Sequence, residues 1–161
     1  MLYLGIDPGK NGGIAWMRQQ GETCVVNAVP MSATLRDLSD LLASLAETSN
    51  LRSCAIEKVA SRPGQGVKSC FTFGYQYGIV CATVVCNRIS LDRISPRKWQ
   101  TPFCLVMDGT VPRTLKKNKH KAKAQELFPH LKITHATADA LLICEYWRRY
   151  HQASSRLAQV E

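Results

Sequence analysis

Acidic residues are scarce in this chain of 161 residues. Asp and Glu number 12 against 21 Lys and Arg, which leaves a formal net charge of +9. A surplus of that size on a small protein favours a polyanionic partner such as nucleic acid. An anionic membrane surface would also suit the charge, but no basic amphipathic helix supports it.

Long apolar runs, targeting signals and internal repeats are also missing. No apolar run reaches the roughly 18 residues of a membrane-spanning helix, and the chain opens directly on the strand-like segment 2–6. We therefore expect a cytoplasmic protein with no membrane partner, or one of an organelle matrix if the chain is a trimmed mature form. No Gly/Ser-rich linker divides the sequence, so we expect a single domain over residues 1–161.

Cysteine pairs with metal-binding spacing are absent, although seven cysteines are present. None forms a Cys-x-x-Cys motif, most have apolar neighbours, and their number is odd. Free cysteine in a reducing compartment behaves as a small apolar residue. We therefore expect reduced thiols rather than a zinc site or disulfides.

The order of predicted elements indicates a mixed sheet with flanking helices. Strands are expected over 2–7, 13–18, 23–29, 52–57 and 88–94, and helices over 34–50, 68–86 and 137–151, with another beginning at Ser95. A loop rich in Gly and Pro spans 62–66. This order does not match an uninterrupted doubly wound array, so an α/β fold with a mixed sheet is favoured.

Three of the twelve acids follow or interrupt apolar segments: Asp7, Glu57 and Asp139. A carboxylate in such surroundings must be hydrogen-bonded, paired with a cation or bound to a metal. Three carboxylates without an evident basic partner favour Mg²⁺ or Mn²⁺, although each could instead cap a helix or pair with an arginine. His135 precedes Asp139 by four residues, so it is either a fourth ligand on the same helix face or a surface histidine.

Five motifs occur in an order that resembles the RuvC-type Holliday junction resolvases, in particular their phage and plant-chloroplast relatives. They are GIDPGKNGG at 5–13, AIE at 55–57, the loop and helix at 65–78, SPRKWQ at 95–100 and ADALL at 138–142. The first motif alone would be weak, because ATP-dependent sugar kinases open similarly, but 161 residues leave no second lobe to close over a nucleotide. The resemblance implies an RNase H-like fold, with a five-stranded mixed sheet flanked by helices.

The resemblance also implies a homodimer that cuts two strands of a four-way DNA junction symmetrically, leaving 5′-phosphates. Asp7, Glu57 and Asp139 match the catalytic, metal-binding acids of the family, which hold two Mg²⁺ or Mn²⁺ ions for an in-line displacement. Bacterial relatives carry an acid or histidine three residues before the last acid, where this chain has Ala136; the phage-like pattern places it four residues before, at His135. We therefore assign His135 as the fourth catalytic ligand. The departure at Ala136 supports the alternative of a non-cleaving junction-binding or architectural protein.

Basic and aromatic residues supply the expected DNA contacts. Six of the eleven residues over 113–123 are Arg or Lys and none is acidic, which favours a phosphate-contacting surface over a solvated, mobile loop. The residues assigned to DNA binding are Gln65, Lys68, Phe71, Phe73, Arg97, Lys98, Lys116, Lys117, Lys119 and Lys121. One of the two phenylalanines is expected at a subunit interface instead. Gly74, Gly78 and Ala82 recur at every fourth residue and would let another helix approach closely, which the resemblance links to the homodimer.

Overall fold

In the computed structural model, which describes residues 1–21, 23–49, 52–61 and 64–157, five strands form one mixed sheet in the order β3-β2-β1-β4-β5. The strands are β1 (Leu2–Asp7), β2 (Gly13–Gln20), β3 (Thr23–Pro30), β4 (Arg52–Glu57) and β5 (Ser90–Ile94). The first three form an antiparallel meander, while β4 lies parallel to both β1 and β5. The predicted five-stranded mixed sheet is confirmed, with β1 at its centre.

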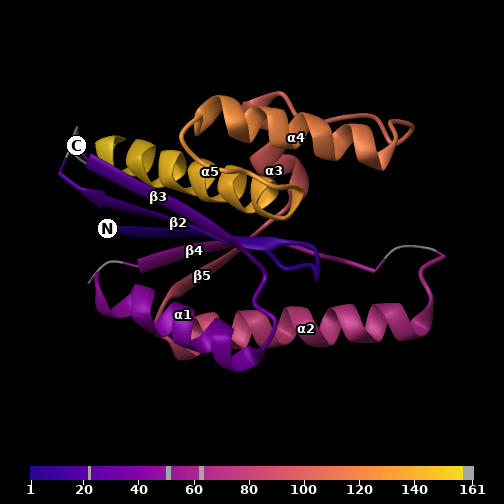
Figure 1. Cartoon of the computed structure of the whole chain (residues 1–161), viewed down its shortest axis with the longest axis horizontal. Coiled ribbons are helices and arrows are strands. Elements are labelled where there is room, and N and C mark those ends of the chain that lie inside the picture. The colour runs from indigo at the N-terminus through magenta and orange to yellow at the C-terminus, as the bar shows by residue number, and fades with distance from the viewer. Residues whose placement is uncertain (22, 50–51, 62–63, 158–161) are drawn as a thin grey trace.

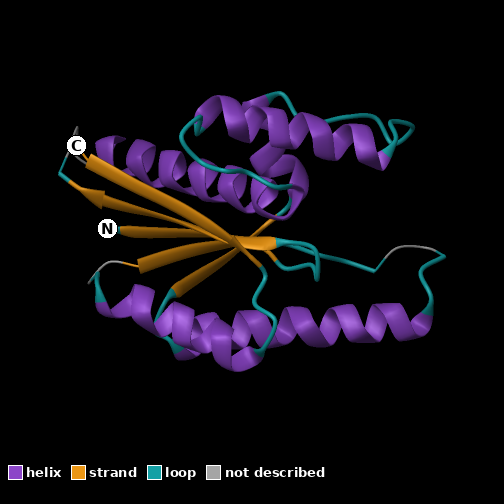
Figure 2. Ribbon diagram, in the orientation of Figure 1, coloured by secondary structure: helices purple, strands orange, loops and turns teal. Residues whose placement is uncertain are grey.

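Helices cover both faces of the sheet (Figure 1, Figure 2). They are α1 (Leu35–Glu47), α2 (Val67–Cys86), α3 (Pro96–Gln100), the short 3-10 helix η1 (Thr101–Phe103), α4 (Arg113–Leu127) and α5 (His135–Leu157). Alternate residues of β1 point to opposite faces, so Leu4 and Ile6 pack with α1 and α2, whereas Tyr3 packs with α3 and α5. The result is two apolar cores, one on each side of the sheet.

Local capping explains where α1 and α5 begin. The hydroxyl of Thr34 accepts the backbone N–H of Asp37 at 3.1 Å, as expected for the start of α1. The hydroxyl of Thr134 accepts the backbone N–H of Thr137 at 3.3 Å, and α5 therefore begins two residues earlier than predicted. Strand β5 begins later than predicted, because Arg88 turns the chain with a φ of 57°.

The basic run over 113–123 forms the first part of α4, an element that the sequence analysis does not predict. Its strongly charged composition gives no apolar periodicity that would predict a helix. The helix nevertheless has a buried side, formed by His120 and Ala124. Asn50, the predicted end of the first helix, and residues 62–63 of the predicted loop lie outside the described residues.

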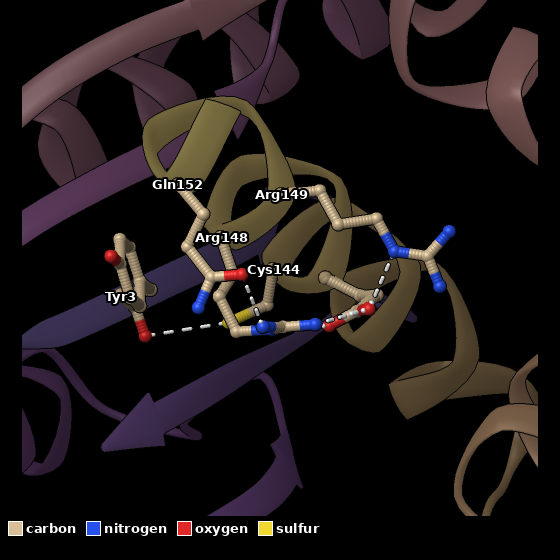
Figure 3. A network of polar contacts seen from close by, with 6 residues as sticks. Tyr3, Cys144, Arg148, Arg149 and Gln152 are labelled. Carbon is tan, nitrogen blue, oxygen red and sulfur yellow. Dashed lines mark hydrogen bonds and ion pairs between the residues drawn. The ribbon is translucent and has the colours of Figure 1, made fainter. Parts of the chain in front are cut away.

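Helix α5 lies directly on β1 because Gly5 has no side chain. A Cβ atom at Gly5 would collide with the backbone nitrogen of Cys144 and the carbonyl oxygen of Ala140. The thiol of Cys144 also donates to the carbonyl oxygen of Tyr3 at 3.3 Å (Figure 3). These contacts set the position of α5 along β1, and therefore the position of Asp139 near the carboxyl end of that strand.

A buried ion-pair network lies on the following turn of α5 (Figure 3). Glu145 is 5% exposed, and its two carboxylate oxygens accept hydrogen bonds from Nε of Arg148 at 2.8 Å and Nε of Arg149 at 2.6 Å. Arg148 also donates to Gln152 at 2.8 Å. This acid therefore engages both arginines within the helix, and the three charges sum to +1.

Helix α2 presents a long apolar surface to solvent. Val80, Cys81 and Val84 are its buried residues, and they face the sheet. The exposed side is formed by apolar and small residues at three- and four-residue spacing: Val67, Phe71, Gly74, Tyr75, Gly78, Ala82 and Val85. These seven residues are the apolar face of α2.

By length and composition, α2 is also the one described helix that could cross a membrane, with a mean hydropathy of 1.3. Lys68 and Gln76 interrupt its apolar run, which is why the sequence shows no unbroken span. A single helix of this kind is weak evidence for a membrane, because helices of soluble proteins meet the same criterion.

Candidate active site

Asp7 and Glu57 lie at the ends of two neighbouring parallel strands. The register pairs Ile6 of β1 with Ile56 of β4, so the residue that follows each of them carries a carboxylate at the same edge of the sheet. Gly12 lies tightly against Asp7, since a Cβ atom there would collide with the carbonyl and carboxyl groups of that residue. The turn after β1 therefore packs around Asp7.

Asp139 approaches the same point from α5, and the electrostatics link the three acids. Burial raises the pKa of Asp7 to about 6, and the charge of Asp139 adds to the rise. Burial likewise raises the pKa of Glu57 to about 7, with further contributions from Asp7 and then Asp139. After burial, the charge of Asp139 opposes ionisation of Asp7, and the charges of Asp7 and Asp139 oppose ionisation of Glu57; a bound cation would relieve this condition.

The three acids line one groove of about 1110 Å³. Its wall also carries basic side chains from three segments of the chain: Lys10, Lys58, Arg113, Lys116 and Lys117. An anionic centre inside a cationic rim suits a phosphodiester backbone, because the rim attracts the phosphates and the centre can hold a cation.

His120 of α4 belongs to this site, although the sequence analysis assigns it no role. It is 7% exposed, it lines the groove, and its Nδ1 lies 2.7 Å from Oδ1 of Asp139. Its ring meets the indole of Trp99 edge to face, with 5.4 Å between ring centroids. The signal in the sequence is the i, i+4 pair of His120 and Ala124, which marks an inward face once the basic run is taken as a helix.

Trp99 is the second residue without an assigned role. It is fully buried, and its indole Nε1–H donates to Oε2 of Glu57 at 2.8 Å. It lies in α3, which begins at Ser95 and Pro96 as predicted. The motif SPRKWQ therefore carries a residue that touches a predicted catalytic acid. Its two basic residues are exposed and are not among the described residues that line the groove.

His135 lies outside the cluster of acids. It is exposed, its Nε2 lies 2.9 Å from Oδ1 of Asn118, and it is not among the described residues that line the groove. Asn118 and His120 are two residues apart on α4 and bond His135 and Asp139 of α5, respectively. The structure thus brings His120 to the last acid, and the role of His135 as a ligand stays a prediction.

The donor set fits a hard divalent cation. Within the described ranges, no three His, Cys, Asp or Glu side chains are close enough to enclose a metal ion. The carboxylates of Asp7, Glu57 and Asp139 nevertheless supply the oxygen ligands that Mg²⁺ and Mn²⁺ prefer. A cation would offset the burial and the neighbouring charge that raise the pKa of Asp7 and Glu57.

The residues assigned to DNA binding divide into two groups. Four line the groove: Gln65, Phe73, Lys116 and Lys117. The other six lie on nearby helices: Lys68 and Phe71 on α2, Arg97 and Lys98 on α3, and Lys119 and Lys121 on α4. The ammonium of Lys98 lies 5.4 Å from the ring centre of Tyr150. The basic surface is thus centred on α4 and continues from there into the groove.

The two phenylalanines at the start of α2 have different surroundings. Phe71 is 75% exposed and belongs to the apolar face of α2, whereas Phe73 is half-buried and lines the groove. Two positions along a helix differ by about 200° in direction, so neighbouring residues of one type can serve different surfaces.

Comparisons with known proteins agree with this architecture. No protein-family model matches the chain, and no curated protein sequence matches it. The solved structure of Thermus thermophilus RuvC is similar, with a TM-score of 0.63 and 14% identity over 96% of this chain and 97% of that one.

Two further solved structures are similar at low identity. RuvC from T. thermophilus in complex with a Holliday junction substrate has a TM-score of 0.62 and 12% identity, over 95% of this chain and 96% of that one. The yeast mitochondrial Holliday junction resolvase Ydc2 has a TM-score of 0.49 and 15% identity, over 92% and 78%. Over nearly its whole length, this chain therefore has the fold of the RuvC resolvase.

Proposed function

We propose that this protein is a metal-dependent endonuclease that resolves four-way DNA junctions by paired, symmetric nicks. The observation that carries the proposal is the meeting of Asp7, Glu57 and Asp139, from β1, β4 and α5, in one groove with a basic rim. The fold is that of RuvC, for which a complex with a Holliday junction substrate is known.

The three acids have different positions in the cation site. Asp7 ends the central strand β1, which pairs with β4 and packs against α5, so it is the central carboxylate and the natural shared ligand. Mg²⁺ or Mn²⁺, two ions per site by the family resemblance, would activate a water and stabilise the leaving 3′ oxygen of the phosphodiester. The protein's share is to hold these carboxylates at one place in a fixed orientation, with no nucleophilic side chain of its own.

The basic rim binds and orients the DNA. Lys116 and Lys117 line the groove from α4, and Lys119 and Lys121 extend the positive charge along the same helix. Phosphate contacts of this kind supply affinity without sequence preference. Phe73 borders the groove, where an aromatic ring can stack on a base that is unpaired at the crossover.

A homodimer would place two such grooves on one junction. The apolar face of α2 is the surface for this contact, since Val67, Phe71 and Tyr75 are 87%, 75% and 62% exposed in the single chain. A two-fold interface suits a four-way junction, which presents two equivalent strands for cutting.

A cleavage assay tests the proposal. Mobile and fixed four-way junctions are incubated with the protein and Mg²⁺ or Mn²⁺, and nicks on the four strands are mapped. We expect symmetric nicks from the wild type and none from Asp7→Asn, with junction binding kept, because the substitution removes the central carboxylate and spares the basic surface. Asp92→Asn, at an exposed acid of β5, is the matched control and should cut normally.

Binding without nicks in either metal would contradict the enzyme and favour a non-cleaving junction-binding protein instead. Near-normal cleavage by Asp7→Asn would contradict the assignment of the cation site while leaving junction resolution itself in place.

A further inference from the structure

Two carboxylates of the groove are hydrogen-bonded to side chains of other helices. Oε2 of Glu57 accepts the indole N–H of Trp99 at 2.8 Å, and Oδ1 of Asp139 lies 2.7 Å from Nδ1 of His120. In the described part of the chain, each hydrogen bond uses one oxygen and leaves the other, Oε1 of Glu57 and Oδ2 of Asp139, for a further ligand.

The side chain of His120 is held in one orientation by its surroundings. It is 7% exposed, and its ring is held edge to face against Trp99, which is fully buried. An ionised carboxylate can only accept a hydrogen bond, so Nδ1 of His120 carries the proton in this contact. The buried ring therefore presents one N–H donor in a set direction.

The contact also joins two elements that are distant in sequence. His120 belongs to α4, and Asp139 lies 19 residues later on α5. On α5 itself, the position three residues before Asp139 is Ala136, which has no polar side chain, and His135 is bonded to Asn118. The imidazole that reaches the last acid is therefore supplied by α4.

We propose that His120 is a positioning residue of the cation site: its Nδ1–H holds Oδ1 of Asp139 and leaves Oδ2 for the cation. This inference rests on the proposed function and names the residue that orients one of its ligands. Groups that hydrogen-bond to a metal ligand fix the orientation of that ligand, and losing one weakens metal binding by about 10- to 100-fold.

The test measures Mn²⁺ binding to the full chain without DNA, by isothermal titration calorimetry. His120→Leu fills similar space without a donor, whereas His120→Asn keeps an N–H at the depth of Nδ1. We expect His120→Leu to weaken Mn²⁺ binding about tenfold or more, and His120→Asn to stay close to the wild type. His130→Leu, at an exposed histidine, is the matched control and should bind Mn²⁺ normally.

Comparison among the variants separates positioning from packing. His120→Gln keeps polarity but places its N–H beyond the depth of Nδ1, so it should resemble His120→Leu and can replace it if the leucine variant does not fold. Equal losses in His120→Asn and His120→Gln would overturn the proposal, since packing against Trp99 would then explain both.

Other outcomes separate this inference from the proposed function. If the wild type binds Mn²⁺, Asp7→Asn abolishes binding and the His120 variants bind normally, His120 has no positioning role and the cation site stands. If His135→Ala weakens binding and His120→Leu does not, the histidine at the site is His135. A wild type that binds no Mn²⁺ overturns both the cation site and the role of His120.

Discussion

Helices α2 and α4 lie on opposite sides of the sheet, and both expose much of their surface, but with opposite chemistry (Figure 1). Residues 113–123 of α4 carry six Arg and Lys residues, while α2 exposes its apolar face. A charged helix is well solvated in water, whereas a continuous apolar surface of this kind indicates a partner that covers it. Exposure alone therefore does not indicate function; the chemistry of the exposed side does.

Both helices also contribute residues to the groove. Phe73 comes from α2, and Lys116, Lys117 and His120 come from α4, on either side of the three acids. The structure thus separates a surface suited to protein contact from a surface suited to DNA, with the candidate active site between them.

The largest expected effect comes from placing the same charge on each helix. Ala82→Glu adds a carboxylate to the apolar face of α2, and Ala122→Glu adds one to the exposed side of α4. Burying an unpaired charge at an interface costs several kcal/mol, so Ala82→Glu should weaken the dimer by about a hundredfold or more. Sedimentation velocity should show a monomer for Ala82→Glu and a dimer for Ala122→Glu.

The same measurements can contradict the assignment of the apolar face of α2 to a subunit interface. A wild type that is monomeric at micromolar concentration, or an Ala82→Glu protein that stays dimeric, would show that the apolar face of α2 is not the subunit interface.

A smaller effect is expected from removing charge on α4. Lys117, Lys119 and Lys121 are replaced together by Gln, and junction affinity is measured against salt concentration by fluorescence anisotropy. Each phosphate contact contributes about 0.9 to the slope of log K against log salt, so the slope should fall by about 2 to 3. The matched control replaces Arg36, Arg88 and Lys132, which are exposed and lie outside α4, with Gln. Equal slopes for the two triple variants would mean that α4 has no special role in DNA binding.

The smallest expected effect is on thermal stability, and it comes from the ionisation of Glu57. Glu57 has a pKa of about 7 in the fold, above its ordinary value of 4.5, chiefly because it is buried and lies near Asp7. The folded protein therefore binds this proton more tightly than the unfolded chain does, so stability decreases as pH rises from about 4.5 to about 7. Glu57→Gln removes that loss and should raise Tm in EDTA at pH 8 by several degrees, with no gain at pH 4.

Thermal unfolding at both pH values checks this prediction, with Glu47→Gln at an exposed acid of α1 as the control. Mg²⁺ should reverse the order at pH 8, because it stabilises only the protein that keeps the carboxylate. A Glu57→Gln protein that is less stable than the wild type at pH 8 in EDTA would mean that the bond from Trp99 outweighs the cost of the buried charge.

Local patterns were sufficient for much of the fold and for the three acids. The strands at 2–7 and 52–57 are short apolar runs that end in a carboxylate, Asp7 and Glu57 respectively. The start of α1 follows from the capping hydroxyl of Thr34. These features depend on residues within a few positions of one another, which is why the amino-acid sequence alone determines them.

Only the tertiary structure decided which histidine meets the last acid and which phenylalanine faces the groove. His135 shares a helix with Asp139 and satisfies the spacing, yet α4 packs across α5 and presents His120 to the acid and Asn118 to His135. Spacing along a chain limits which residues can share one face of a helix, but the packing of another element determines what that face touches. The direction in which α2 meets the sheet likewise assigns Phe73 to the groove and Phe71 to solvent, because long-range burial sets the rotation of a helix about its axis.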